Sequence, residues 1–202
     1  MKQENVEVPY PHYRCPSCGK DLPPEEARIT VTCSAHQAPD RLQFTVREAV
    51  LPADRRAIEE ICDKALGETE VDTFASTFDV LKGTNLIADV DGELGGLLSM
   101  AVRRGELVLV LLSVYPDHQG QGVGSALLRA AITFAQERGL PSVRVAVSND
   151  DIPLIHFYQR HGFVIDEIVV GLLADNLGEA VPGFSGIPVR DEIRFRRPVC
   201  SA

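Results

Sequence analysis

Leu107–Gly124 reads LVLVLLSVYPDHQGQGVG, an apolar run followed at once by a glycine-rich turn. The run itself, Leu107–Val114, is apolar on both faces, which predicts a strand in the interior of a sheet. The turn leads into a helical pattern over about Gly122–Arg138. Unpaired amides converge at a helix N-terminus, the helix dipole is positive there, and glycines let an anion approach closely. This stretch therefore predicts a phosphate-binding loop.

The spacing of the glycines excludes two common types of phosphate-binding loop. A dinucleotide-binding fingerprint G-x-G-x-x-G starting at Gly120 would need glycine where Ser125 stands. A Walker loop needs a lysine after its last glycine, and Gly124 is not followed by one. The pattern that fits is Q-x-x-G-x-G, formed by Gln119, Gly122 and Gly124.

A second segment, Asn149–Phe163 (NDDIPLIHFYQRHGF), places Tyr158 four residues before Gly162 on an expected helix. Together with the buried strand and the Q-x-x-G-x-G turn, it makes the chain resemble the GNAT superfamily of acetyl-CoA-dependent N-acetyltransferases over about Phe44–Phe195. The resemblance implies an α/β fold with a GNAT-type mixed, mostly antiparallel sheet flanked by helices, and acetyl-CoA as cosubstrate. Asp151 departs from the pattern, because many members have asparagine at this position.

The resemblance also implies which groups hold acetyl-CoA. Backbone groups at the end of the apolar strand would bind the pantetheine and the acetyl carbonyl. The amides of the turn, with one serine hydroxyl, would bind the diphosphate. Fixed amides aimed at the carbonyl oxygen would stabilise the charge that develops there during transfer. The candidate cofactor-binding residues are Leu112, Val114, Gln119, Gly120, Gln121, Gly122, Val123, Gly124, Ser125, Asn149 and Asp151.

Acetyl transfer also needs an acid and a base. Tyr158 is the candidate general acid, since a phenol with a pKa of about 10 can protonate a thiolate whose conjugate acid has a pKa of about 8.5. In histone-type members, a glutamate on the central strand acts as the general base, and this chain has Val108 at that position. Glu106 is therefore the candidate base, with Asp191, Glu192 or a water chain as alternatives. Nearby histidines are expected to be structural or solvent-facing: His118, His156 and His161.

Hydrophobic periodicity predicts the remaining elements. The expected strands are 42–49, 85–90, 94–102, 107–114, 142–147, 163–170 and 189–195, and the expected helices are 51–66, 70–81, 122–138 and 151–161. Short connections at Asp91–Gly92 and Arg104–Gly105 favour antiparallel hairpins between the second, third and fourth strands. Cys62 falls on a helical apolar stripe, which favours a place in the core.

The N-terminal part of the chain carries a separate pattern, a C-x2-C pair and a C-x2-H pair. Two such pairs supply the four ligands of a tetrahedral zinc ion, and a shell closed by four protein ligands is structural. The segment resembles a zinc ribbon, with His12 as a competing fourth ligand. The candidate zinc ligands are Cys15, Cys18, Cys33 and His36.

The composition limits the function further. The chain has 202 residues and a formal net charge of −9, which disfavours binding to nucleic-acid phosphates and favours cationic partners such as amines. No apolar run approaches the roughly 20 residues that span a bilayer, so no membrane partner and a cytoplasmic location are expected. The expected domains are a zinc-ribbon-like module over 1–40 and an acetyltransferase domain over 42–198.

These observations predict an N-acetyltransferase that moves an acetyl group from acetyl-CoA to a primary amine. The acceptor is a small molecule or a protein amino group, and a homodimer is left open. The alternative is a non-catalytic acyl-CoA-binding module whose zinc ribbon docks a protein partner, because Val108 cannot act as a base.

Overall fold

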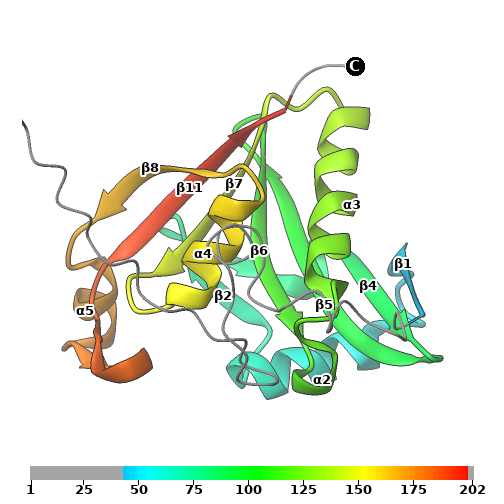
Figure 1. Cartoon of the computed structure of the whole chain (residues 1–202), viewed down its shortest axis with the longest axis horizontal. Coiled ribbons are helices and arrows are strands. Elements are labelled where there is room, and N and C mark those ends of the chain that lie inside the picture. Colours follow the sequence, from blue (N-terminus) through cyan, green and yellow to red (C-terminus); the bar gives the residue numbers. More distant parts are fainter. Residues whose placement is uncertain (1–42, 200–202) are drawn as a thin grey trace, which may run out of the picture. The chain divides into compact units, whose positions relative to one another are not determined.

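Seven strands form one mixed sheet in the computed structural model, which describes residues 43–199 (Figure 1). Neighbouring strands are antiparallel except for one parallel pair, β6 with β7, near the middle of the sheet. The mixed, mostly antiparallel sheet expected from the sequence is therefore confirmed. In sheet order the strands are β1 (Phe44–Glu48), β4 (Thr84–Val90), β5 (Glu93–Arg103), β6 (Glu106–Val114), β7 (Ser142–Ser148), β11 (Glu192–Pro198) and β8 (Val164–Val169).

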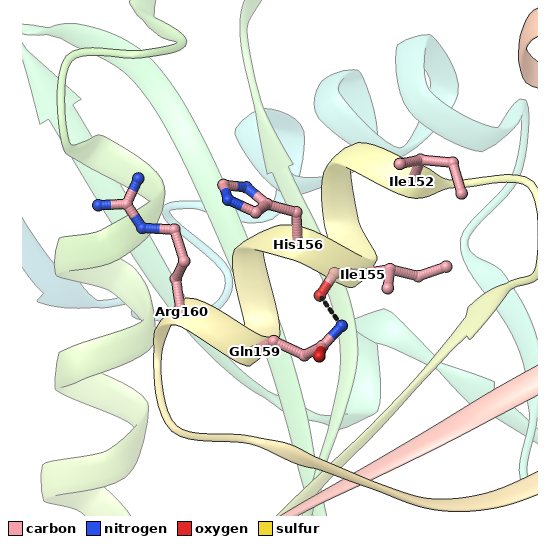
Figure 2. Close-up of a pocket in the computed structure, with 5 residues that line it drawn as sticks. All are labelled: Ile152, Ile155, His156, Gln159 and Arg160. Atoms are coloured by element: carbon pink, nitrogen blue, oxygen red, sulfur yellow. Dashed lines mark hydrogen bonds between the residues drawn. The ribbon is translucent and has the colours of Figure 1, made fainter. Parts of the chain in front are cut away.

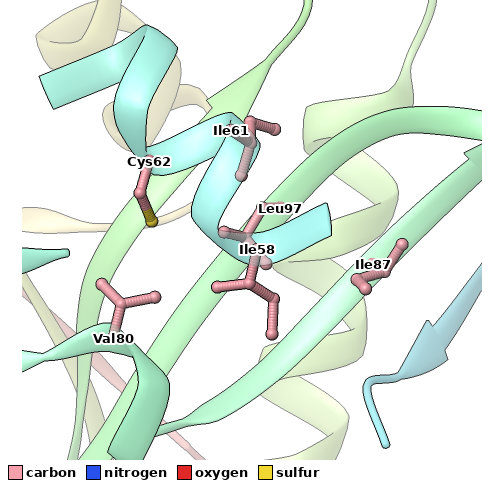
Figure 3. Close-up of a cluster of buried hydrophobic side chains, with 6 residues drawn as sticks. All are labelled: Ile58, Ile61, Cys62, Val80, Ile87 and Leu97. Carbon is pink, nitrogen blue, oxygen red and sulfur yellow. The ribbon is translucent and has the colours of Figure 1, made fainter. Parts of the chain in front are cut away.

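Helix α2 (Arg55–Leu66) covers one face of this sheet through its apolar stripe. Burial of this stripe removes apolar surface from water and stabilises the fold. Cys62 lies in the stripe and is a fully buried core residue, as its spacing predicts. Figure 3 shows the cluster that the helix forms with the sheet, made of Ile58, Ile61, Cys62, Val80, Ile87 and Leu97.

Helix α3 (Val123–Glu137) covers the opposite face. A Cβ atom placed on Gly96 of β5 would lie 3.2 Å from Leu127 of α3, whereas the next residue, Leu97, packs in the α2 cluster. Successive residues of a strand point to opposite faces, so the two helices sandwich the central strands.

The segment 70–81, expected as a helix, is instead a hairpin, so that prediction was wrong. Strand β2 (Glu70–Thr73) pairs with β3 (Ser76–Asp79), and a short 3-10 helix follows at Val80–Lys82. Phe74 and Ala75 form the turn with φ of 51° and 52°. The β-branched and aromatic residues of this stretch suit a half-buried strand better than a helix, and their short alternation outweighs the weak helical pattern.

Beyond the central sheet, the structure adds short elements to a region expected as a loop. Helix α4 (Ile152–Arg160) is the helix expected over 151–161. After β8, however, a six-residue helix α5 (Leu172–Leu177) lies between Gly171 and Gly178, both left-handed. The two-residue strands β9 (Val181–Pro182) and β10 (Pro188–Val189) then pair on either side of a 3-10 turn at Phe184–Gly186.

In the part of the chain that the structure describes, no helix is long and apolar enough to cross a membrane. The expected zinc-ribbon-like module over 1–40 lies outside the described residues.

Candidate active site

Strands β6 and β7 pair over only a short stretch and then diverge, as Figure 1 shows. The parallel register joins Leu107–Leu109 to Val143–Val145, and no further pairs between these two strands follow in the described chain. Strand β6 continues its pairing with β5 on the other side. A register shift leaves Val110 without a counterpart on β5, and such a bulge bends a strand. The second half of β6 therefore has one free edge.

The residues expected to bind the cofactor through their backbone lie on this free edge. The Tyr115 amide donates to the Gly95 carbonyl of β5 at 3.0 Å, so Tyr115 directs its backbone groups toward β5. Alternate residues of an antiparallel strand point their N–H and C=O groups in opposite directions. Val114 and Leu112 therefore direct theirs away from β5, toward the opening. All of Val110–Val114 is half-buried.

The side chain of Gln119 connects the turn to the end of this strand by a hydrogen bond. Its side-chain Nε2 donates to the Val114 carbonyl at 2.9 Å, and the side chain of Gln121 donates to the Asp117 carbonyl at 2.7 Å. Both glutamines thus shape the loop through their side chains. The Gln119 amide also donates to the Pro116 carbonyl at 3.2 Å, so the amides that could meet an anion are those that follow Gln119. Sequence reasoning assigned Gln119 to the cofactor and missed this bracing role.

The turn itself exposes amides at the start of α3. Gly122 is the residue preceding the helix and has φ of 92°, and Gly120 has φ of 72°. Both values lie in the left-handed region that side-chain-bearing residues rarely adopt. The first amides of α3, at Val123 and Gly124, have no partner four residues back within the helix. These amides and the positive end of the helix dipole are the features by which helix N-termini bind anions in other proteins.

Helix α4 docks on this first turn of α3. A Cβ atom placed on Gly124 would lie 3.6 Å from Val114 Cγ2 and 3.8 Å from the Phe157 ring, so the strand end, the turn and α4 meet at this glycine. His161, expected to be structural or solvent-facing, lies with Nε2 3.0 Å from the Ser125 hydroxyl oxygen.

Asn149 and Asp151, both candidate cofactor-binding residues, are occupied by local contacts. The Asp151 carboxylate accepts from the Leu154 amide at 3.0 Å and caps α4. The Asn149 side chain accepts from the amides of Arg190 and Asp191 at 2.8 and 2.9 Å. These side chains fix the entry to α4.

Tyr158 is almost completely buried on α4, with 2% of its surface exposed. Its ring contacts the rings of Phe157, Phe163 and Phe195 at centroid distances of 5.3, 5.4 and 6.2 Å. Burial raises the pKa of Tyr158 well above the ordinary value for a phenol, and the nearby charge of Asp151 raises it further. The phenol therefore keeps its proton in neutral solution and can act as a hydrogen-bond donor or an acid.

Glu106 begins β6 at the opposite end from the free edge. Its carboxylate accepts from the Ser142 hydroxyl and from Arg196 Nε at 3.2 Å, and it lies 3.8 Å from Arg144. At about 3.3 Å per residue, the six positions from Glu106 to Leu112 span about 20 Å along the strand. The carboxylate therefore joins β6, β7 and β11 far from the backbone groups expected to hold the acetyl carbonyl.

The alternative carboxylates, Asp191 just before β11 and Glu192 at its start, are also paired. Asp191 accepts from Arg190 Nη2 at 2.9 Å and from the Gly171 amide at 2.8 Å. Glu192 is 3% exposed and accepts from Arg194 Nε at 2.6 Å, and its other oxygen lies 3.3 Å from both Thr73 Oγ1 and the Phe74 amide. Glu192 is opposite Ser148 of β7, so it lies at the end of the sheet where the strands diverge. The β2–β3 hairpin thus contacts the sheet beside the opening. The prediction of a helix over this segment did not include this contact.

The hollow in Figure 2 lies on α4 alone, since all of its lining residues come from that helix: Ile152, Ile155, His156, Gln159 and Arg160. Tyr158 is not among them. Within residues 43–199, no group of three or more histidine, cysteine, aspartate or glutamate side chains is placed to hold a metal ion. The candidate zinc ligands lie outside that range.

A free strand edge beside a glycine turn at a helix N-terminus, with a buried phenol on the adjoining helix, suits a thioester attached to a phosphate-bearing carrier. The profile of the acetyltransferase (GNAT) family matches residues 53–163, and the chain belongs to this family.

Individual proteins are similar to this chain in sequence or in fold. The chain is 33% identical over 122 residues to a streptothricin acetyltransferase from Streptomyces lavendulae, a match that covers 59% of this chain and 62% of the relative. Ard1 from Thermoplasma volcanium shares the fold with a TM-score of 0.60 and 24% identity, over 78% of this chain and 99% of that one. A GNAT acetyltransferase from Elizabethkingia anophelis with acetyl-CoA bound gives a TM-score of 0.59 at 19% identity, over 77% of this chain and 97% of that one.

Proposed function

We propose that this protein is an acetyl-CoA-dependent N-acetyltransferase that acylates a primary amine. The observation that carries the proposal is the free edge of β6 at Leu112 and Val114, directly followed by the glycine turn. The amine nitrogen attacks the thioester carbon, the carbon–sulfur bond breaks, the amine loses a proton and the departing thiolate gains one. Each residue role below serves one of these changes.

The backbone of β6 and the turn would hold acetyl-CoA, which supplies the activated acetyl group. Leu112 and Val114 would bind the pantetheine and the acetyl carbonyl through main-chain groups that β5 leaves free. The amides from Gly120 to Gly124, with the Ser125 hydroxyl, would bind the diphosphate at the start of α3. Donors fixed in place before the reaction stabilise developing negative charge without reorganising.

Tyr158 would protonate the leaving thiolate. Its raised pKa keeps the phenol protonated, and its aromatic contacts with Phe163 and Phe195 hold the ring in one position. A positioned acid of this kind contributes about a hundredfold or more to a rate.

For the proton that the amine loses, we propose water in the opening between β6 and β7 as the acceptor. The pairing of Glu106 with Arg196 and Arg144, and its distance along the strand from Leu112, support a structural role for this carboxylate. Glu192 lies at the diverging end of the sheet, but its burial and its pairing with Arg194 support a structural role for it as well.

The test is an acceptor screen in which free thiol is detected after acetyl-CoA is mixed with amines. Streptothricin belongs in the panel because a relative is named for it, together with polyamines and peptides with free amino groups. Thiol release that depends on one class of amine supports the proposal. Absence of turnover with every amine, together with unchanged behaviour of a Tyr158→Phe variant, would contradict it.

A non-catalytic acyl-CoA-binding module remains the second candidate, because Val108 is 4% exposed and packs in the core where a base would stand. Tight binding of acetyl-CoA without thiol release from any acceptor would favour this candidate.

We also propose that Cys15, Cys18, Cys33 and His36 bind one structural zinc ion, with His12 as the competing fourth ligand. The spacing of the two ligand pairs supports this. Elemental analysis should find one zinc per chain, and Cys15→Ser should lower that ratio. Replacing His12 and His36 in turn identifies the fourth ligand. A metal-free wild-type protein would contradict the proposal.

A further inference from the structure

His161 links the end of α4 to the start of α3 through both of its ring nitrogens. Nδ1 lies 2.8 Å from the Phe157 carbonyl oxygen, and Nε2 lies 3.0 Å from the Ser125 hydroxyl oxygen. The imidazole ring also packs against the Phe157 ring at a centroid distance of 4.4 Å. The ring is half-buried and held from three sides.

These contacts determine where the protons lie. A carbonyl oxygen can only accept, so Nδ1 carries a hydrogen and donates it to Phe157. In the neutral ring Nε2 then has a lone pair, and the Ser125 hydroxyl must donate its single hydrogen to it. In the charged ring Nε2 carries a hydrogen as well, and it donates to the Ser125 oxygen instead.

The two arrangements present different groups to an anion at the start of α3. When Ser125 donates to a neutral His161, its oxygen offers lone pairs alone, which repel a phosphate oxygen. When a charged His161 donates to Ser125, the hydroxyl hydrogen is free to bond a phosphate oxygen. The second arrangement joins two donors, the Nε2–H of His161 and the hydroxyl of Ser125, in a chain that ends at the anion, and charge-assisted hydrogen bonds of this kind are the stronger ones.

We propose that His161 is a positioning residue that sets the direction of the Ser125 hydroxyl and takes up a proton when the diphosphate of acetyl-CoA binds. The proposal rests on the proposed function, which places the diphosphate at this turn. It adds a coupling between cofactor affinity and pH, because lower pH favours the form of His161 that frees the hydroxyl hydrogen.

Charged groups on the packed elements do not replace His161 in this role. Arg129 lies one turn further along α3, Arg160 precedes His161 on α4, and Arg197 of β11 would lie 3.7 Å from a Cβ atom placed on the adjacent Gly162. Arginines keep their charge throughout the physiological range. The other histidine on these elements is His156, which is exposed on another face of α4 and lines the hollow in Figure 2.

Calorimetry measures the proton uptake directly. Binding of 3′-dephospho-coenzyme A, whose diphosphate keeps its charge near neutrality, is recorded at pH 7 in buffers with different ionisation enthalpies. The slope of heat against ionisation enthalpy gives the protons taken up. Wild type should take up a substantial fraction of one proton, and His156→Gln should match it.

Two substitutions at His161 distinguish the effect of its proton uptake from the effect of its hydrogen bond to Ser125. His161→Gln keeps an amide donor toward Ser125 but cannot titrate, so its proton uptake should fall to near zero and its affinity should stay flat from pH 6 to 8. His161→Phe keeps the ring contact with Phe157 but donates nothing, so the KM for acetyl-CoA should rise about tenfold while kcat is retained. Ser125→Ala should abolish the proton uptake without altering His161.

The outcomes are distinct. If wild type binds and His161→Gln takes up as many protons as wild type, the role of His161 is wrong while the proposed function stands. If neither dephospho-coenzyme A nor acetyl-CoA binds wild type at all, both proposals fail.

Discussion

Tyr158, the proposed acid, is nearly completely buried, and it lies on α4, the helix that docks on the first turn of α3 through Phe157. Burial in an aromatic cluster favours the neutral phenol, because the ionised form would lose its hydration. A group that is to donate a proton at neutral pH must hold that proton until the thiolate forms. The same contacts that stabilise the core therefore keep the proposed acid in its active form.

We predict that Tyr158→Phe lowers kcat by about a hundredfold and leaves the KM for acetyl-CoA almost unchanged. The substitution removes the hydroxyl and keeps the ring that contacts Phe163 and Phe195. Steady-state kinetics with thiol detection measure both constants. Tyr115→Phe, at a half-buried tyrosine whose hydroxyl meets Glu60 of α2, is the matched control and should retain wild-type kcat. Equal losses in both variants would argue against the acid role.

The same tyrosine predicts a pH dependence of stability. Its folded pKa lies above the ordinary value of 10.0, so the folded state holds the proton more tightly than the unfolded state does. Its contribution to the free energy of unfolding is complete below pH 10 and is lost as the pH rises from there toward the folded pKa. Thermal unfolding between pH 8 and 11 should show a steeper fall in Tm for wild type than for Tyr158→Phe. Parallel curves would show that the phenol is not protected by burial.

At the scale of elements, the end of β6 and the start of α3 depend on the conformation of the turn between them. Gly122 adopts a φ of 92° with no atom within 4 Å of a Cβ position, so a substitution there strains the backbone without colliding with a neighbour. Any loss of cofactor binding in a Gly122 variant would therefore report the backbone conformation of the turn.

We predict that Gly122→Ala raises the KM for acetyl-CoA about tenfold and destabilises the fold by about 1 kcal/mol. Gly67, which ends α2 with a φ of 80° and equally open surroundings, offers a matched control. Gly67→Ala should cost a similar free energy of unfolding and leave the KM for acetyl-CoA unchanged. Kinetics and chemical denaturation of both variants provide the comparison, and a wild-type KM in Gly122→Ala would contradict the proposed diphosphate site.

The carboxylate at the other end of β6 leads to a different expectation. Glu106→Gln should lower the free energy of unfolding by about 1–2 kcal/mol, because Arg196 and Arg144 lose a charged partner. Its kcat should stay within the range of Glu93→Gln, a control at the exposed start of β5. A large loss of kcat with an unchanged Tm would instead identify Glu106 as the base.

Elements with strong patterns were predictable from the sequence, and those fixed by tertiary contacts were not. The apolar run of β6 predicts a buried strand and the periodic stripe of α2 predicts a helix, and the structure has both elements. The hairpin at 70–79 was missed because each of its strands has only four residues, too few to separate a period of two from a helical period. Helix α5, six residues between two glycines, is too short for any periodic signal.

The residues of the candidate site also divide into those predictable from local spacing and those placed by tertiary contacts. The glycine turn and Tyr158 could be found from the sequence because their spacing is local. The Gln119 contact with Val114 and the His161 contact with Ser125 join residues that the fold alone brings together. The bulge at Val110 and the divergence of β6 from β7 likewise depend on register, which the apolar pattern of β6 does not encode.

At the scale of the whole molecule, every group proposed to hold acetyl-CoA or to protonate its thiolate lies within residues 43–199. Both clusters that position these groups, α2 with the sheet and α4 with the first turn of α3, are also complete within that range. A chain that starts at residue 42 should therefore contain all that cofactor binding needs.

We predict that removing residues 1–41 leaves the KM for acetyl-CoA unchanged and removes the zinc. The shortened chain keeps the buried stripe of α2, the seven-stranded sheet and the turn at Gly122, which together determine the diphosphate site. Calorimetry with acetyl-CoA and elemental analysis on both chains measure the two effects. A loss of cofactor binding by a shortened chain that still unfolds cooperatively would show that the N-terminal segment contributes to the site. A loss of turnover with one amine alone, at unchanged acetyl-CoA affinity, would assign that segment to acceptor recognition.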